Sequence, residues 1–190
     1  MSCSTKMSGN INYDCTPSKR AKAGLEQKAV IINKSDIDMT ALTMSGALVT
    51  NLSLLSGSTG YSVETIKQLH NTAAAFTAND AGADTFAQSY VGRIWGQGVQ
   101  DAERARELKD GEFVVVVQTK WGAGTNEAFK VYGLENGLRM TEATFTSIEN
   151  EGALLFTLSS LEGYQETYPY QIWNEGTYAE NKAKFDALFA

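Results

Sequence analysis

The run of residues 113–120, FVVVVQTK, constrains the fold of this chain more than any other segment. Four consecutive valines favour an extended backbone, because branching at Cβ suits a pleated sheet and restricts the side chain in a helix. A strand without polar alternation is typical of a position covered on both faces. We therefore expect a buried central strand here, and a chain of 190 residues is long enough to build a core around it.

Further runs of β-branched and aromatic residues predict strands that follow one another through short turns. The expected strands cover residues 29–33, 47–55, 86–95, 129–132, 144–148 and 153–158. Residues 163–173, rich in tyrosine, suit an edge strand or an irregular segment. Consecutive strands with short connections favour antiparallel pairing.

Three segments have helical patterns. Residues 62–77 carry an apolar stripe at helical spacing, and residues 99–109 have acids early and bases late. Thr177 and Glu180 form a capping box that opens a final helix with an apolar face. The predicted fold is therefore mainly β (α+β), an antiparallel β-sandwich or barrel with two or three peripheral helices.

Charge and polarity divide the chain into an extended N-terminal arm, residues 1–24, and one β-rich domain, residues 25–190. Residues 1–28 carry a net charge of +3 and the remainder −9, which disfavours general binding of nucleic acid. Cys3 and Cys15 match no zinc pattern, so we interpret them as free thiols. With no signal peptide and no apolar run of membrane-spanning length, we expect a soluble protein without a membrane anchor, made in the cytoplasm.

Motifs for catalysis or cofactor binding are weak in this sequence. His70 is the only histidine, and its place within the expected helix of residues 62–77 indicates a structural residue. Asp36 and Asp38 are spaced to share a strand face, where such a pair is usually solvated. Gly96-x-Gly98 lacks the third glycine of a dinucleotide-binding turn. We expect no enzyme activity, no cofactor and no metal.

The order of elements and three segments of the second half carry a resemblance. The segments are residues 129–138 (FKVYGLENGL), residues 151–158 (EGALLFTL) and Tyr168-Pro169. In these features residues 25–175 resemble the tail-tube proteins of long-tailed bacteriophages, and the second half is similar to virion proteins of phages that infect Bacteroidetes. The helices expected at residues 99–109 and after Thr177 exceed a minimal tube subunit, which leaves a connector, ring or terminator role open.

The resemblance implies a structural virion protein that assembles into rings of six and stacks with neighbouring tail or connector proteins. The genomic DNA would pass through the lumen without specific binding, and a net negative lumen would let phosphates slide. The protein would be located in the virion tail. No catalytic residues carry over.

In such an assembly we expect the N-terminal arm and the loop of residues 121–126 to bridge subunits. Deleting residues 1–24 should leave a folded monomer that does not assemble. For the aromatic members of the expected interface, ordinary core packing remains the other interpretation. The candidate interface residues are Tyr13, Trp121, Asn126, Tyr168 and Trp173.

Two other classes of function stay open. A carbohydrate- or protein-binding β-sandwich would present an aromatic platform, and a small hydrolase would need a carboxylate site for which the sequence offers no candidate. The residues of the expected platform are Tyr164, Tyr168, Tyr170 and Trp173.

Overall fold

The structure, a computed structural model, describes residues 7, 9–11, 22–66, 69–80 and 82–190. Tyr13, Cys3 and Cys15, on which sequence predictions were made, lie outside the described residues. The strands are β1 (Leu25–Asn33), β2 (Thr43–Ser45), β3 (Leu48–Asn51), β4 (Tyr61–Glu64), β5 (Asn71–Thr77), β6 (Thr85–Ile94), β7 (Phe113–Thr119), β8 (Phe129–Tyr132), β9 (Arg139–Phe145), β10 (Leu154–Ser159) and β11 (Gln171–Trp173). The helices are α1 (Val99–Asp110) and α2 (Tyr178–Asp186), with short 3₁₀ turns η1 (Lys34–Asp36) and η2 (Glu149–Gly152).

The strands form two sheets. One has seven strands in the order β2-β3-β11-β8-β7-β1-β4, and the other has four in the order β5-β6-β10-β9. The fold is thus mainly β with peripheral helices, as predicted. The expectation of purely antiparallel pairing is wrong at one place, because β11 pairs with β3 in parallel. The prediction of an edge strand within residues 163–173 is also wrong, because β11 lies between β3 and β8.

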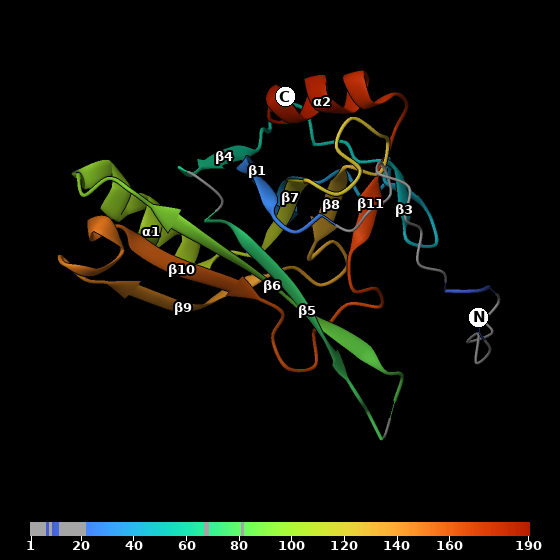
Figure 1. Ribbon diagram of the computed structural model, residues 1–190, viewed down its shortest axis with the longest axis horizontal. Helices are drawn as coiled ribbons and strands as arrows, with labels where there is room; N and C mark the ends of the chain where they lie inside the picture. The colour runs from blue at the N-terminus through green and yellow to red at the C-terminus, as the bar shows by residue number, and fades with distance from the viewer. Residues whose placement is uncertain (1–6, 8, 12–21, 67–68, 81) are drawn as a thin grey trace.

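The seven-stranded sheet is the middle layer of the molecule, with α2 on one face and the four-stranded sheet on the other (Figure 1). Strand β7 lies inside this layer, and all seven of its residues are buried. Val114 and Val116 belong to the core under α2, while Val115 and Val117 belong to the core that faces the four-stranded sheet. The unbroken apolar run is explained by this position, which confirms the predicted central strand.

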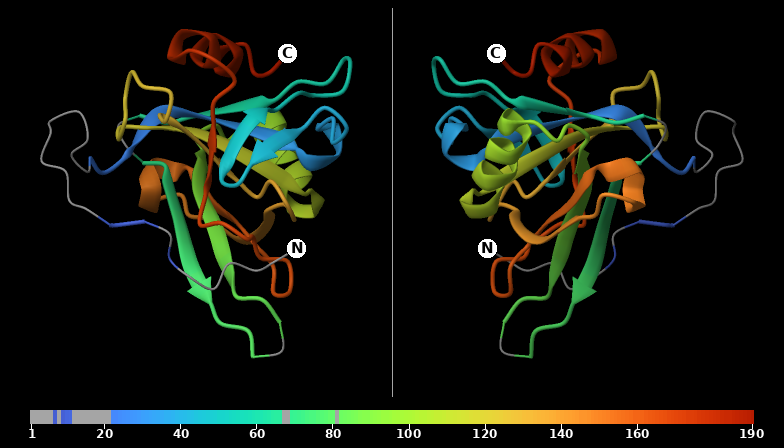
Figure 2. Two further views of the ribbon diagram at one scale, coloured as in Figure 1. Left: turned by 90° about the vertical axis from the view of Figure 1, so that its right-hand side faces the viewer. Right: turned by 90° about the vertical axis from the view of Figure 1, so that its left-hand side faces the viewer.

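Helix α2 begins at the capping box that the sequence predicts. The Thr177 hydroxyl accepts the Glu180 backbone N–H, and the Glu180 carboxylate accepts the Thr177 backbone N–H. Phe185 in the helix and Phe189 after it are buried against the sheet. The ring centroids of Phe189 and Trp173 are 4.8 Å apart. The helix therefore docks on the sheet, and it lies at the end of the molecule opposite the β5–β6 hairpin (Figure 2).

The predicted helix of residues 62–77 is wrong, because this segment forms parts of two edge strands. Strand β4 pairs with β1, and β5 pairs with β6 over seven residues. Ile66 and Phe76, from the supposed apolar face, are 52% and 62% exposed. Alanine-rich residues favour a helix locally, but the long ladder with β6 supplies backbone hydrogen bonds that override this preference.

The other predicted elements hold with shifted bounds. Helix α1 and strands β6, β7, β8 and β10 occur where the sequence places them. The strand predicted at residues 144–148 instead runs from Arg139 to Phe145, and Ile148 beyond it is 90% exposed. The Gly24 carbonyl accepts the Lys120 backbone N–H, so residues at the end of the predicted arm lie against the body of the domain.

Candidate assembly surface

His70, the one histidine, has a structural position between the two sheets. Its Nε2 lies 3.0 Å from the Gln27 carbonyl oxygen and its Nδ1 lies 2.9 Å from the Tyr90 hydroxyl. Because a carbonyl only accepts, Nε2 carries the proton, and Nδ1 accepts from Tyr90. Burial lowers the pKa of His70 and raises that of Tyr90. The predicted place in a helix is wrong, because the residue precedes β5, but both nitrogens are used in structural contacts.

The other weak motifs also have local structural roles. Asp36 lies in η1 and Asp38 in a turn, so the predicted shared strand face does not form. The Asp38 carboxylate accepts the Thr40 and Ala41 backbone N–H groups. Hydrogen bonds to Thr40, followed by the one from Ala41, lower the pKa of Asp38. Gly98 caps α1 and donates its N–H to Asp101.

Two features relevant to other functions are absent from the described ranges. Those residues contain no cluster of three or more histidine, cysteine or acidic side chains that is arranged to hold a metal ion. Among them, neither α-helix has the length and apolar character that crossing a membrane requires.

The four-stranded sheet has two free edges among the described residues. Strand β5 pairs only with β6, and β9 pairs only with β10, so each presents one side without a strand partner. Most residues of both strands are exposed. Unpaired backbone groups along an exposed strand are a template for pairing with another chain.

The hydrogen bonds of β6 show which residues of β5 direct their backbone N–H and C=O groups to the free edge of the sheet. The Phe86 backbone N–H and C=O pair with Glu166, and the Gln88 N–H and C=O pair with Ser160. Both β6 residues thus direct their backbone groups away from β5. Ala74 and Phe76, opposite them in the antiparallel register, therefore direct their own N–H and C=O outward to the free edge.

The face of the four-stranded sheet that is turned away from the core carries mostly small, uncharged side chains. In β6 and β10, residues such as Gln88, Tyr90, Phe156 and Leu158 are buried, and the alternate residues are partly exposed. The register extends this alternation to the edge strands. The outward residues include Asn71, Ala73, Ala75, Ala87, Ser89, Val91, Leu155, Thr157, Ser159 and Thr144.

The register places three charged residues on the same face: Glu142, Arg93 and Arg139, which lies opposite the outward Ser159 and forms an ion pair with Glu112. Glu142 lies opposite the outward Thr157. Arg93, at the end of β6, lies over the Trp95 ring at 5.8 Å from its centroid. The centre of the face is therefore uncharged, whereas the sequence-based expectation for a lumen was a negative surface.

The β5–β6 hairpin extends beyond both sheets as a projecting arm (Figures 1 and 2). Phe76 and Phe86 form an edge-to-face pair with centroids 6.0 Å apart, and Phe76 remains 62% exposed. Asp80 and Asp84 lie near the tip. Phe86 is half-buried, so the exposed Phe76 ring is the apolar surface that this hairpin offers for contact with another molecule.

The candidate interface residues from the sequence do not form one patch. Asn126 is exposed, while Trp121 and Tyr168 are half-buried. Trp173 is 0% exposed and packs edge-to-face on Phe129, 5.4 Å between centroids. Its proposed place at an interface is therefore wrong for the folded subunit, and core packing, the other interpretation, is confirmed. Tyr13 lies outside the described residues.

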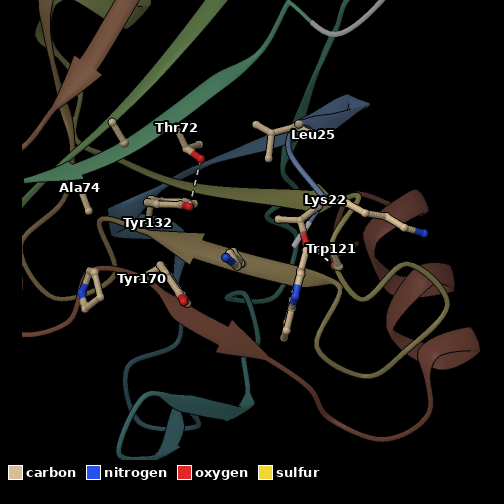
Figure 3. Close-up of a pocket in the computed structure, with 12 residues that line it drawn as sticks. Lys22, Leu25, Thr72, Ala74, Trp121, Tyr132 and Tyr170 are labelled. Carbon is tan, nitrogen blue, oxygen red and sulfur yellow. Dashed lines mark hydrogen bonds between the residues drawn. The ribbon is translucent and has the colours of Figure 1, made fainter. Parts of the chain in front are cut away.

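The aromatic platform expected for a binding module does not form as a unit. Trp173 is buried under α2, so it cannot join the three tyrosines. Tyr164 and Tyr170 are 59% and 37% exposed, and Tyr170 instead lines a pocket with Trp121 (Figure 3).

Two buried polar residues that sequence reasoning missed hold the segment before β11 in place. The Gln88 amide donates to the Tyr168 carbonyl and accepts the Gly133 N–H, at 2.8 and 2.6 Å. The Glu166 carboxylate accepts the Glu135 and Asn136 N–H groups, and burial raises its pKa. Neither residue has a sequence signal, because their partners are backbone groups distant in the chain.

The molecule is a mixed β-sandwich of two sheets with a docked helix, and within the described part of the chain the edge strands β5 and β9 of the four-stranded sheet each lack a second strand partner. Comparisons with protein-family models, curated proteins and solved structures find no match to this chain.

Proposed function

We propose that this chain is a structural, non-enzymatic subunit that assembles edge to edge into rings of a phage tail tube or of a related tail conduit. The observation that carries the proposal is the four-stranded sheet with both edges, β5 and β9, open among the described residues. The rings would stack with one another or with neighbouring tail proteins in the virion.

Pairing of β5 of one copy with β9 of the next would continue the sheet across the interface. The interface uses two different surfaces of each subunit, and such head-to-tail contacts give a closed ring when the rotation between copies closes. A closed barrel of strands has no free edge, which removes the tendency of β5 and β9 to recruit other chains. The resemblance described above favours six copies.

The uncharged outward face is compatible with a lumen for DNA. If the sheet closes with this face inward, Ala, Ser and Thr side chains line the passage. Such a lining offers phosphates no row of cations, so DNA would slide past without specific binding. The projecting hairpin is exposed, and in this proposal the hairpin and the N-terminal arm contact the next ring or a connector protein.

The proposal is tested by blocking one edge. Ala74→Pro removes the N–H that β5 presents to the free edge, and it removes no hydrogen bond to β6. Ala74→Thr is the matched control, because it retains the N–H and favours a strand. Light scattering across a concentration series, with negative-stain images of the same fractions, measures assembly.

We expect rings or stacked tubes for the wild-type chain and the Ala74→Thr variant, and monomers for the Ala74→Pro variant. Circular dichroism establishes that the proline variant is folded. Rings formed equally well by the proline variant would refute the edge contact, and a wild-type chain that stays monomeric at every concentration would contradict the assembly itself.

A further inference from the structure

A pocket of about 360 Å³ lies between β8, the edge strand β5 and the loop that follows β7 (Figure 3). Trp121 stands on one side of it, and Tyr132 and Tyr170 lie on the other. Lys22, Thr72 and Lys130 also contribute to the wall. Ala74 of β5, whose backbone N–H the assembly proposal uses, also lines this pocket, but the side chains that face into it have no part in that proposal.

The charges around the pocket have one sign. Of the residues that the structure describes, Lys22 and Lys130 line the pocket and no acidic residue does, on a chain whose net charge is −6. Among the described residues no carboxylate lies within ion-pair distance of the Lys130 ammonium. That ammonium lies 3.7 Å from the centroid of the Tyr170 ring and 5.8 Å from that of the Trp121 ring.

The Lys130 ammonium loses part of its hydration in the pocket without gaining a counter-ion from the described residues, which costs free energy. Burial lowers the pKa of Lys130, and no neighbouring acid opposes the effect. The two rings compensate part of this cost through cation–π contact. A lysine kept in such a position is a candidate for a functional residue.

The pocket also holds two phenolic hydroxyl groups that can donate hydrogen bonds. The Thr72 hydroxyl donates to the Tyr132 hydroxyl at 3.0 Å, as Figure 3 shows, so the proton of Tyr132 is free to be donated. Burial raises the pKa of Tyr132, which keeps the phenol protonated. The Tyr170 hydroxyl has no hydrogen-bond partner within the described part of the chain.

We propose that this pocket binds a carboxylate group, with the Lys130 ammonium as counter-ion, the Tyr132 hydroxyl as donor and the Trp121 and Tyr170 rings against the body of the ligand. A carboxylate matches the positive charge of the pocket and its ammonium and hydroxyl donors. The carboxylate can belong to a free small molecule such as an acidic sugar, or to an acidic side chain of a second copy. Asp80 and Asp84 of the projecting hairpin are candidates for the second source.

Titration calorimetry with D-glucuronate tests the site directly, with D-glucose as the uncharged control sugar. We expect saturable binding of glucuronate alone, weakened by salt and at least tenfold weaker in the Lys130→Met variant. Lys109→Met, at the exposed end of α1, removes the same charge and should bind as the wild type. Tyr132→Phe keeps the ring and loses the hydroxyl, so it should bind glucuronate several-fold more weakly than the wild type. This variant replaces Lys130→Met as the test if Lys130→Met does not fold.

Light scattering of the full chain, which measures self-association, distinguishes the two possible sources of the carboxylate. If a second copy supplies the carboxylate, Lys130→Met and the double variant Asp80→Asn, Asp84→Asn both reduce association; if a free ligand does, neither changes it while glucuronate binding persists. Absence of saturable glucuronate binding by the wild type, or equal binding by Lys130→Met, overturns the proposal. Ala74 itself lines this pocket, so the edge is tested independently with Phe76→Pro, which removes the N–H that Phe76 directs to the same edge at a position outside the pocket lining; loss of rings in that variant while glucuronate still binds separates the two proposals.

Discussion

At the scale of single residues, the polar groups buried between the sheets hold the layers together. His70 connects the Gln27 carbonyl of β1 to the Tyr90 hydroxyl of β6, and Gln88 connects β6 to two distant loops. A buried polar group whose partner is removed costs about 1–3 kcal/mol, so these contacts fix the relative position of the sheets.

His70 makes stability depend on pH. Its folded pKa is lowered by burial, so between that value and the ordinary pKa of about 6.5 the unfolded chain binds the proton and the folded chain does not. The contribution of His70 to the free energy of unfolding should therefore be constant above about pH 6.5. As the pH decreases from about 6.5, the free energy of unfolding should decrease by up to about 1.4 kcal/mol per pH unit. His70→Gln, which retains a donor and an acceptor, should lose this slope in urea unfolding curves at pH 5–7.5.

Parallel pH dependence of the wild type and the His70→Gln variant would contradict this role. Glu166 contributes equally to the unfolding curves of the wild type and the variant, so it cancels in the comparison. Because its pKa is raised in the folded chain, its contribution to stability increases as the pH decreases, opposite to that of His70.

At the scale of elements, a sequence pattern predicts the structure correctly where the interactions that decide it are between residues close in the chain. The capping box of Thr177 and Glu180 fixes the start of α2, and the valine run fixes β7. The segment of residues 62–77 is the counter-example, because its helical stripe is overridden by ladders with β1 and β6.

Loss of the cap should weaken the docking of α2. Thr177→Ala removes the acceptor of the Glu180 N–H and the side-chain hydrogen bond to Glu180, and we expect a loss of about 1 kcal/mol in unfolding free energy. The near-ultraviolet dichroism of Trp173, which packs under the helix, should weaken as well. Ser45→Ala, at an exposed position, is the control, and equal stability of the two variants would show that packing alone holds the helix.

At the scale of the whole molecule, the exposed features of the described residues are two strand edges without a strand partner and a projecting hairpin. The seven-stranded sheet is covered on both faces, whereas the four-stranded sheet has one face and two edges exposed. Assembly would cover these edges, which is the physical reason for the proposed ring.

Removal of the N-terminal arm should separate folding from assembly. A deletion of residues 1–21 keeps Lys22 to Gly24, including the Gly24 carbonyl that accepts from Lys120. We expect an unchanged melting temperature and loss of rings in light scattering, because the arm is proposed to bridge subunits. Normal rings from the truncated chain would exclude the arm from assembly.

The sequence by itself determined the features that depend on residues near one another in the chain. Four valines in succession specify a doubly buried strand, a capping box specifies a helix start, and Asn136-Gly137 specifies a turn whose glycine has φ of +81°. Charge and the lack of catalytic motifs led equally directly to the expectation of a non-enzymatic protein.

Only the tertiary structure decided the features that depend on long-range pairing. Which strands lie at the edges, where Trp173 is buried and how Lys130 comes to lie between Trp121 and Tyr170 follow from contacts between segments distant in sequence. An edge strand and a central strand have similar local propensities, and a one-residue change of register would move every side chain to the opposite face. The free strand edges and the pocket beside Lys130 are therefore properties of the packed sheets, which no local pattern encodes.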